Sequence, residues 1–84
     1  MSEVEIGSVS DFFAKPVVAG IILTDELKVG DKLHIVGHTT DLELTIDSMQ
    51  LNNANITEGK PGDAIGVKVP DRVRAGDKVF KIIE

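Results

Sequence analysis

The chain has no cysteine, and this absence limits the ways in which its 84 residues can be stabilised. Without cysteine, the fold holds neither disulfide bonds nor thiolate zinc sites. A chain this short buries only about 60–65% of its unfolded surface, so its stability must come from packed valine, leucine and isoleucine. We expect a single domain spanning residues 1–84. A cysteine-free chain also fits a reducing compartment, and we expect a cytoplasmic location.

Long apolar runs and nucleotide-binding motifs are missing as well. The longest apolar run, Val17–Leu23, includes Gly20 and is far shorter than the ~20 residues that cross a bilayer. The opening residues, Met1–Glu5, lack the basic and apolar regions of a signal peptide. No Gly-x-x-x-x-Gly-Lys-Ser/Thr phosphate loop is present. The sequence therefore predicts a soluble protein with no membrane contact and no nucleotide cofactor.

Positive charge is scarce, and it is unevenly distributed. The net charge is −5, and residues 1–59 hold ten acidic side chains against three lysines. Such an acidic surface is a poor generic partner for nucleic acid, because affinity for phosphates comes largely from basic side chains. Residues 60–84 are weakly basic, with six basic side chains against four acidic ones. This third of the chain either forms a local basic patch or is a solvated surface.

Short segments rich in valine and isoleucine recur between turn signals, a pattern typical of all-β proteins. We expect strands over residues 4–9, 17–23, 32–36, 42–46, 49–51, 64–69 and 77–83. Asp11–Pro16 is interpreted as a turn or loop, because Pro16 disfavours helix at the residue before it. The apolar alternation changes parity between Ile46 and Met49, which predicts a β-bulge near Asp47 and Ser48.

Three Gly-Asp pairs punctuate the chain, at residues 30–31, 62–63 and 76–77. Two of them lie in segments of similar sequence, Leu27–Val36 and Val73–Ile82. Glycine adopts positive φ at little cost and aspartate bonds nearby backbone groups, so each pair predicts a tight turn that leads into a strand. Calcium loops need several oxygens in one segment, and each pair here stands alone.

Several of these segments together resemble domain 2 of the translational GTPases, the β-barrel that follows the G domain in elongation factor Tu and initiation factor two. The resemblance covers about Ile6 to Ile83 and is carried by five blocks: Val17–Leu33, Ile35–Gly37, Ile46–Gln50, Gly59–Gly66 and Val73–Val79. It implies an all-β fold, a small six- to seven-stranded antiparallel β-barrel that is closed or partly closed. Closure also removes exposed strand edges.

The resemblance implies a non-enzymatic, translation-related binding module that contacts tRNA, ribosomal RNA or a protein partner. The chain has no G domain, and Ile21 stands where the family often has arginine, so neither GTP hydrolysis nor the aminoacyl site is carried over. The chain also resembles the small C-terminal domain of some bacterial collagenase-like peptidases, an accessory domain without catalytic residues. An accessory domain acting with an enzyme is therefore the alternative function.

Five side chains are the candidate partner-binding residues: Phe12, Phe13, Lys68, Arg72 and Arg74. Two adjacent phenylalanines in a loop cannot easily both face the core. An exposed one can stack on a base or anchor a protein partner. The basic residues are those that would form the local basic patch.

We expect no catalytic, cofactor-binding or metal-binding residues. His34 and His38, with Asp41, are the only candidates for metal or acid–base chemistry. Strand residues four apart are separated by roughly 13 Å, too far to share a metal unless the turn at Gly37 brings them together. Ser8, Ser10 and Ser48 lack a Gly-x-Ser-x-Gly elbow.

Overall fold

The computed structural model describes residues 2–14, 17–52 and 54–83, which form strands and turns only. The strands are β1 Ser2–Ala14, β2 Val17–Leu23, β3 Leu27–Lys28, β4 Lys32–Val36, β5 Asp41–Thr45, β6 Met49–Leu51, β7 Ala54–Ile56, β8 Glu58–Gly59, β9 Ala64–Lys68 and β10 Lys78–Ile83. The predicted all-β class is confirmed. Most of the predicted strands are present with similar bounds.

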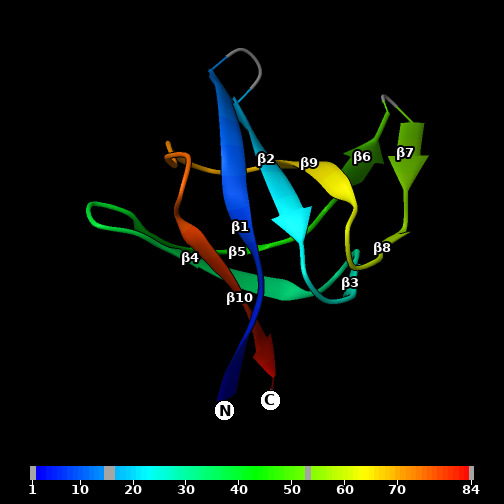
Figure 1. Ribbon diagram of the computed structural model, residues 1–84, viewed down its shortest axis with the longest axis horizontal. Coiled ribbons are helices and arrows are strands. Elements are labelled where there is room, and N and C mark those ends of the chain that lie inside the picture. Colours follow the sequence, from blue (N-terminus) through cyan, green and yellow to red (C-terminus); the bar gives the residue numbers. More distant parts are fainter. Residues whose placement is uncertain (1, 15–16, 53, 84) are drawn as a thin grey trace.

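Eight of the strands form one curved antiparallel sheet in the order β5-β4-β10-β1-β2-β9-β6-β7. The long strand β1 lies at its centre, with β2 beside it (Figure 1). The short strands β3 and β8 pair separately. The first half of β1 pairs with β10, so Ser2 lies opposite Ile83.

The predicted closure into a barrel is wrong. In the part of the chain that the structure describes, no strand ladder joins β5 to β6 or β7, so β5 and β7 are free edges. Ile46 continues the pairing of β5 with β4 by one further residue. Its N–H donates to the Asp31 carbonyl at 3.0 Å, and its carbonyl accepts from the Gly30 N–H at 2.9 Å. The backbone is thereby held at the turn before β4, and β6 then pairs with β9.

The predicted loop over residues 11–16 is also wrong for its described part, because β1 continues to Ala14 (Lys15 and Pro16 lie outside the described residues). Two β-bulges interrupt β1, between Glu5 and Gly7 and between Val9 and Asp11. Such bulges bend a strand and allow it to pair with different partners along its length. The bulge predicted near residues 47–48 is not present, since these residues connect β5 to β6.

The three Gly-Asp turns share one bonding pattern. Gly30, Gly62 and Gly76 have φ of 97°, 93° and 97°, as the third position of a type II turn requires. In each turn the aspartate N–H bonds back to the carbonyl three residues earlier, and its carboxylate accepts from the N–H of that same residue. The turn interpretation of the Gly-Asp pairs is confirmed.

Each turn is also bonded to a buried residue elsewhere in the fold. The N–H of the turn glycine donates to the carbonyl of that buried residue. The N–H of the buried residue in return donates to the carbonyl of the turn aspartate. The buried partners are Ile46 for the turn at Gly30, Leu23 for the turn at Gly62 and Val9 for the turn at Gly76. The turns therefore join separate parts of the sheet, beyond reversing the chain.

The core lies on the concave face of the sheet and is aliphatic. It contains fifteen buried apolar side chains: Ile6, Val9, Ala19, Ile21, Leu23, Leu27, Leu33, Ile35, Ile46, Met49, Ile65, Val67, Val69, Val73 and Val79. No phenylalanine is among them, although Phe12 packs partly buried against the cluster. Alternation along each strand places the opposite set of side chains on the outer surface.

Candidate partner-binding surface

The end of the β1–β2 hairpin carries a small apolar surface. We define this hairpin tip by four residues: Phe12, Phe13, Ala14 and Val17. Phe12 lies opposite Ala19 and Phe13 opposite Val18, so the two phenylalanines point to opposite faces of the sheet. Phe12 packs against the core, whereas Phe13 is 55% exposed and Val17 is 39% exposed. One of the two phenylalanines is therefore a surface residue.

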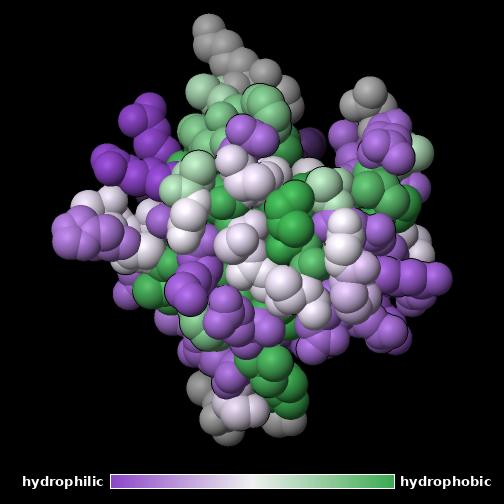
Figure 2. Space-filling model, in the orientation of Figure 1, coloured by the Kyte–Doolittle hydropathy of each residue, from purple (hydrophilic) through white to green (hydrophobic). Residues whose placement is uncertain are grey.

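A shallow cavity of about 290 Å³ lies beside the hairpin tip. Phe12, Ala14 and Val17 line one side of it, and Pro70, Asp71 and Arg72 line the other. The second side is fixed because the Val69 N–H donates to the Val17 carbonyl at 3.2 Å. Figure 2 shows hydrophobic residues at this end of the hairpin, next to a hydrophilic region.

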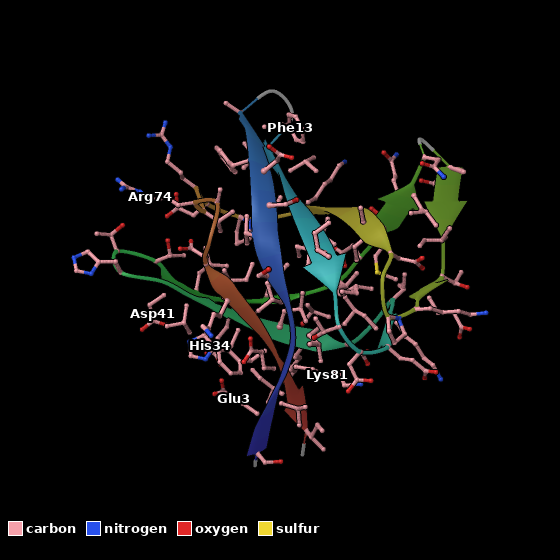
Figure 3. All side chains as sticks on the ribbon, in the orientation of Figure 1. Glu3, Phe13, His34, Asp41, Arg74 and Lys81 are labelled. Carbon is pink, nitrogen blue, oxygen red and sulfur yellow. The ribbon has the colours of Figure 1, made fainter. Side chains whose placement is uncertain are left out.

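The three candidate basic residues do not gather at one point. Arg72 lines the cavity at the hairpin tip. Arg74 extends from the neighbouring turn toward solvent (Figure 3), and its backbone N–H bonds the Asp77 carboxylate at 2.8 Å. Lys68 lies opposite Val18 on β2 and lines a different cavity, next to β5. Among the described residues, none of these three cations has an ion-pair partner.

A histidine cluster occupies another part of the surface. The His34 Nδ1 lies 2.8 Å from Glu3 Oε1, and its Nε2 lies 2.6 Å from Asp41 Oδ1. The cluster joins β1, β4 and the start of β5 (Figure 3). The hydrogen bonds to Asp41 and then to Glu3 raise the pKa of His34 above its ordinary value of 6.5. Both ring nitrogens then act as donors, which favours the imidazolium form.

This cluster differs from the one considered in the sequence. His34 and Asp41 are brought together, while His38 lies exposed in the connection between β4 and β5. Glu3 was not a candidate, because it is 31 residues from His34 and only the strand register places it there. Among residues 2–14, 17–52 and 54–83, no group of three or more potential ligands is arranged to hold a metal ion.

Four residues that line the hairpin-tip cavity were also not predicted, namely Ala14, Val17, Pro70 and Asp71. Val17 begins the strand predicted over residues 17–23, and its exposure follows from its position at the end of β2. The described part of the chain contains no helix with the length and apolar character needed to cross a membrane.

Comparison with known proteins finds similarity to a protease and to a peptidase domain. No family model matches it. It is 41% identical over 83 residues to an uncharacterized protease of Methanocaldococcus jannaschii, covering 98% of this chain and 20% of the protease. The chain thus spans about a fifth of the length of this curated relative.

Two solved structures share the fold. Both are the C-terminal domain of a "putative U32 peptidase" of Geobacillus thermoleovorans, one of them the selenomethionine variant. The first has a TM-score of 0.88 at 13% identity and covers 94% of this chain and 92% of that domain. The second has a TM-score of 0.86 at 13% identity and covers 90% and 96%. At this level of identity, the likeness concerns the fold alone.

These matches overturn the resemblance to a translation factor and, with it, the expectation of an elongation-factor-like RNA-binding protein. The protease and the U32 domain are what the chain is similar to, and neither is a translation-factor barrel. Three of the five blocks behind the resemblance contain a Gly-Asp turn with its flanking strand residues. A Gly-Asp turn before a strand is a common local structure that unrelated proteins share. The similarity of these blocks therefore reflected local structure and not a common origin. The fold is that of the C-terminal domain of a U32 peptidase.

Proposed function

We propose that this chain is an accessory, non-catalytic domain that works with the catalytic unit of a peptidase and contacts it through the hairpin tip. The observation that carries the proposal is the exposure of Phe13 and Val17 at the end of the hairpin, where Val17 also lines the shallow cavity and Phe13 points to the opposite face of the sheet. Exposed aromatic and aliphatic groups beside a recess are typical anchors of protein–protein contacts.

The chemistry of the tip defines the surface that it would meet. Phe13 would enter an apolar recess on the catalytic unit, and the cavity lined by Phe12 and Pro70 would receive an apolar side chain from it. Arg72 and Arg74 have no ion-pair partner among the described residues. Carboxylates on the catalytic unit would pair with them at the rim of the contact.

The similarity to peptidases supports the proposal that the partner is the catalytic unit of a peptidase. The relative from M. jannaschii is a protease about five times as long as the matched region, which leaves most of that protein for a catalytic unit. The solved neighbours are C-terminal domains of a larger peptidase. In that arrangement a small domain accompanies a larger peptidase. We propose the same role for this chain, with the catalytic unit in the same polypeptide or in a separate one.

The absence of a catalytic set among the described residues supports a non-enzymatic role. The Ser10 hydroxyl donates to the Gly20 carbonyl, and no described serine or threonine hydroxyl bonds a histidine. His34 is engaged by two carboxylates, so neither ring nitrogen is available as a general base for a hydroxyl. Peptide hydrolysis is accordingly assigned to the partner unit.

Hydrogen exchange in a full-length chimera tests the proposal without requiring a known substrate. The matched region of the M. jannaschii protease is replaced by this chain, and exchange is compared with that of the isolated chain. We expect the amides of residues 11–14 and 17–20 to exchange at least about ten-fold more slowly in the chimera. Phe13→Ser should remove this protection. Val29→Ser, at an apolar residue 39% exposed at another turn, should not. Equal exchange in the chimera and the isolated chain would refute docking through the tip.

A further inference from the structure

The open edge of the sheet offers a second binding surface, separate from the hairpin tip. We propose that the free edge of β5 binds an extended peptide as an added strand, with lysine or arginine at alternate positions of that peptide. This inference does not depend on the proposed docking of the hairpin tip, because it concerns the edge of β5 and can be measured with the chain alone. Pro70 lines both the cavity at the hairpin tip and the cavity beside β5.

The first argument is the unused hydrogen-bonding edge. β5 pairs with β4 along its whole length, from Asp41 opposite Val36 to Thr45 opposite Lys32. Among the described residues, no backbone group on its other side bonds another strand or loop. A row of free N–H and C=O groups is a ready template for an incoming strand. The other free edge, β7, is only three residues long.

The second argument is incomplete burial on the core face of β5. Leu42 lies opposite Ile35, and Leu44 lies opposite Leu33. Ile35 and Leu33 are fully buried, whereas Leu42 and Leu44 are only partly buried although they pack against the same core. They stay partly exposed because, in the part of the chain that the structure describes, no strand lies beyond β5 to cover them. An added strand with apolar residues on that face would complete their burial.

The third argument is the space beside the edge. A cavity of about 400 Å³ is lined by Glu43, Leu44 and Thr45 on one side and by Lys68, Val69 and Pro70 on the other. A second hollow of about 230 Å³ lies over the cross-strand row of Thr45, Lys32 and Ile82. Glu43, Leu44 and Thr45 line both hollows. Alternate side chains of an added strand point to opposite faces, so each hollow can receive one set.

Charge determines which peptide fits. Residues 41–47 contain three acids, Asp41, Glu43 and Asp47, and no base. Asp41 and Glu43 share the outer face of β5, so residues directly opposite them in an added strand are stabilised if they are basic. Asp41 also contacts His34, while Lys68 on the far wall favours an acidic or neutral residue there. The peptide is therefore apolar on its core-facing side and basic opposite Glu43.

The same charges disfavour a second copy of the chain as the occupant. Antiparallel pairing of two β5 strands centred on Glu43 would place one carboxylate directly against the other. Acidic residues on an edge strand are also a common protection against aggregation. If the acidic residues only prevented aggregation, no peptide would bind at the β5 edge. The proposal instead requires that a basic peptide binds there.

A labelled peptide of about eight residues with alternating valine and lysine tests the proposal. Its affinity is measured by fluorescence anisotropy, and its position by NMR shifts of the isotope-labelled chain. We expect shifts at Asp41–Thr45, Lys68 and Val69. Glu43→Lys should weaken binding at least about five-fold. Glu26→Lys, at an exposed acid outside both hollows, should leave binding within about two-fold.

Further controls separate the possible outcomes. Methylation of alternate backbone nitrogens of the peptide should abolish binding, since it blocks one hydrogen-bonding edge. The chain with Phe13→Ser should bind the peptide normally, which keeps this test independent of the hairpin tip. The proposal is overturned if a valine–glutamate peptide binds equally well, if shifts gather elsewhere, or if no shift occurs. It is also overturned if sedimentation shows that β5 pairs with β5 of a second copy.

Discussion

At the scale of single residues, the three turn glycines show how a local requirement supports the whole sheet. Gly30, Gly62 and Gly76 all adopt positive φ, and a Cβ added at any of them would meet nothing within 4 Å. The cost of a side chain there is therefore conformational and not steric. The turns are needed in that conformation because each bonds a buried residue elsewhere in the fold.

Gly76→Ala should lower the free energy of unfolding by about 1 kcal/mol, because alanine disfavours the left-handed region. Gly66→Ala is the matched control. Its φ lies outside that region, and its added Cβ would lie 3.4 Å from the nearest atom, in Val18. Its effect should be within about 0.5 kcal/mol. Urea denaturation measures both, and equal losses in the two variants would contradict the turn assignment.

His34 should make stability depend on pH. The carboxylates of Asp41 and Glu3 raise its pKa above 6.5 in the folded chain. A raised folded pKa means that the contribution is complete below pH 6.5 and is lost as the pH rises through the folded pKa. The contribution should be less than about 1 kcal/mol, because the Asp41 side chain is 81% exposed.

Urea denaturation of the wild type and His34→Gln at a series of pH values checks this. The difference in free energy of unfolding between the wild type and His34→Gln should be largest near the lower end of the range from about pH 6 to 9. It should shrink as the pH rises. A difference that is constant or grows with pH would show that the contacts of His34 with Glu3 and Asp41 do not stabilise the fold through the charged imidazolium. The His34 titration followed by NMR gives the folded pKa directly.

At the scale of elements, the β1–β2 hairpin shows what sequence patterns capture and what they omit. The apolar run of β2 is plain in the sequence, and the strand forms as predicted. The sequence predicts a loop over residues 11–16 because of Pro16, whereas β1 continues to Ala14 after a bulge between Val9 and Asp11. Only the pairing with β2 reveals that Phe12 and Phe13 lie on opposite faces. A cross-strand register is not visible in a single strand's sequence.

The different environments of the two phenylalanines predict different costs of truncation. Phe12→Ala should lower the free energy of unfolding by about 2 kcal/mol, because Phe12 packs partly buried against the core. Phe13→Ala should change it by less than about 0.5 kcal/mol, since Phe13 is 55% exposed. Thermal or urea unfolding of the two variants measures the difference. Similar losses in both would mean that residues 12 and 13 are not in an extended strand.

At the scale of the whole molecule, the all-β class followed from the recurrent short apolar segments, but the openness of the sheet did not. Closure depends on whether the two edge strands meet, and in the described part of the chain β5 and β7 do not pair with each other. No local pattern in β5 signals this. Leu42 and Leu44 alternate as in any half-buried strand, and the missing neighbour is visible only in three dimensions.

The candidate site was predicted only in part. The adjacent phenylalanines indicate that one of them is exposed, and this residue is Phe13. Of the predicted basic residues, Arg72 lies with Phe12 at one cavity. The sequence did not predict that Lys68 would face a second cavity beside β5, or that Glu3 would reach His34. Both depend on how strands far apart in the chain are aligned across the sheet.

Photo-crosslinking from position 13 in living cells is the most direct test of the central claim, that the chain acts with a peptidase through its hairpin tip. A photoreactive phenylalanine analogue replaces Phe13, or Val29 as the control, and crosslinked proteins are identified by mass spectrometry. The account predicts that position 13 captures the catalytic unit of a peptidase and that position 29 does not. Recovery of no peptidase from position 13, or equal recovery from both positions, would contradict it.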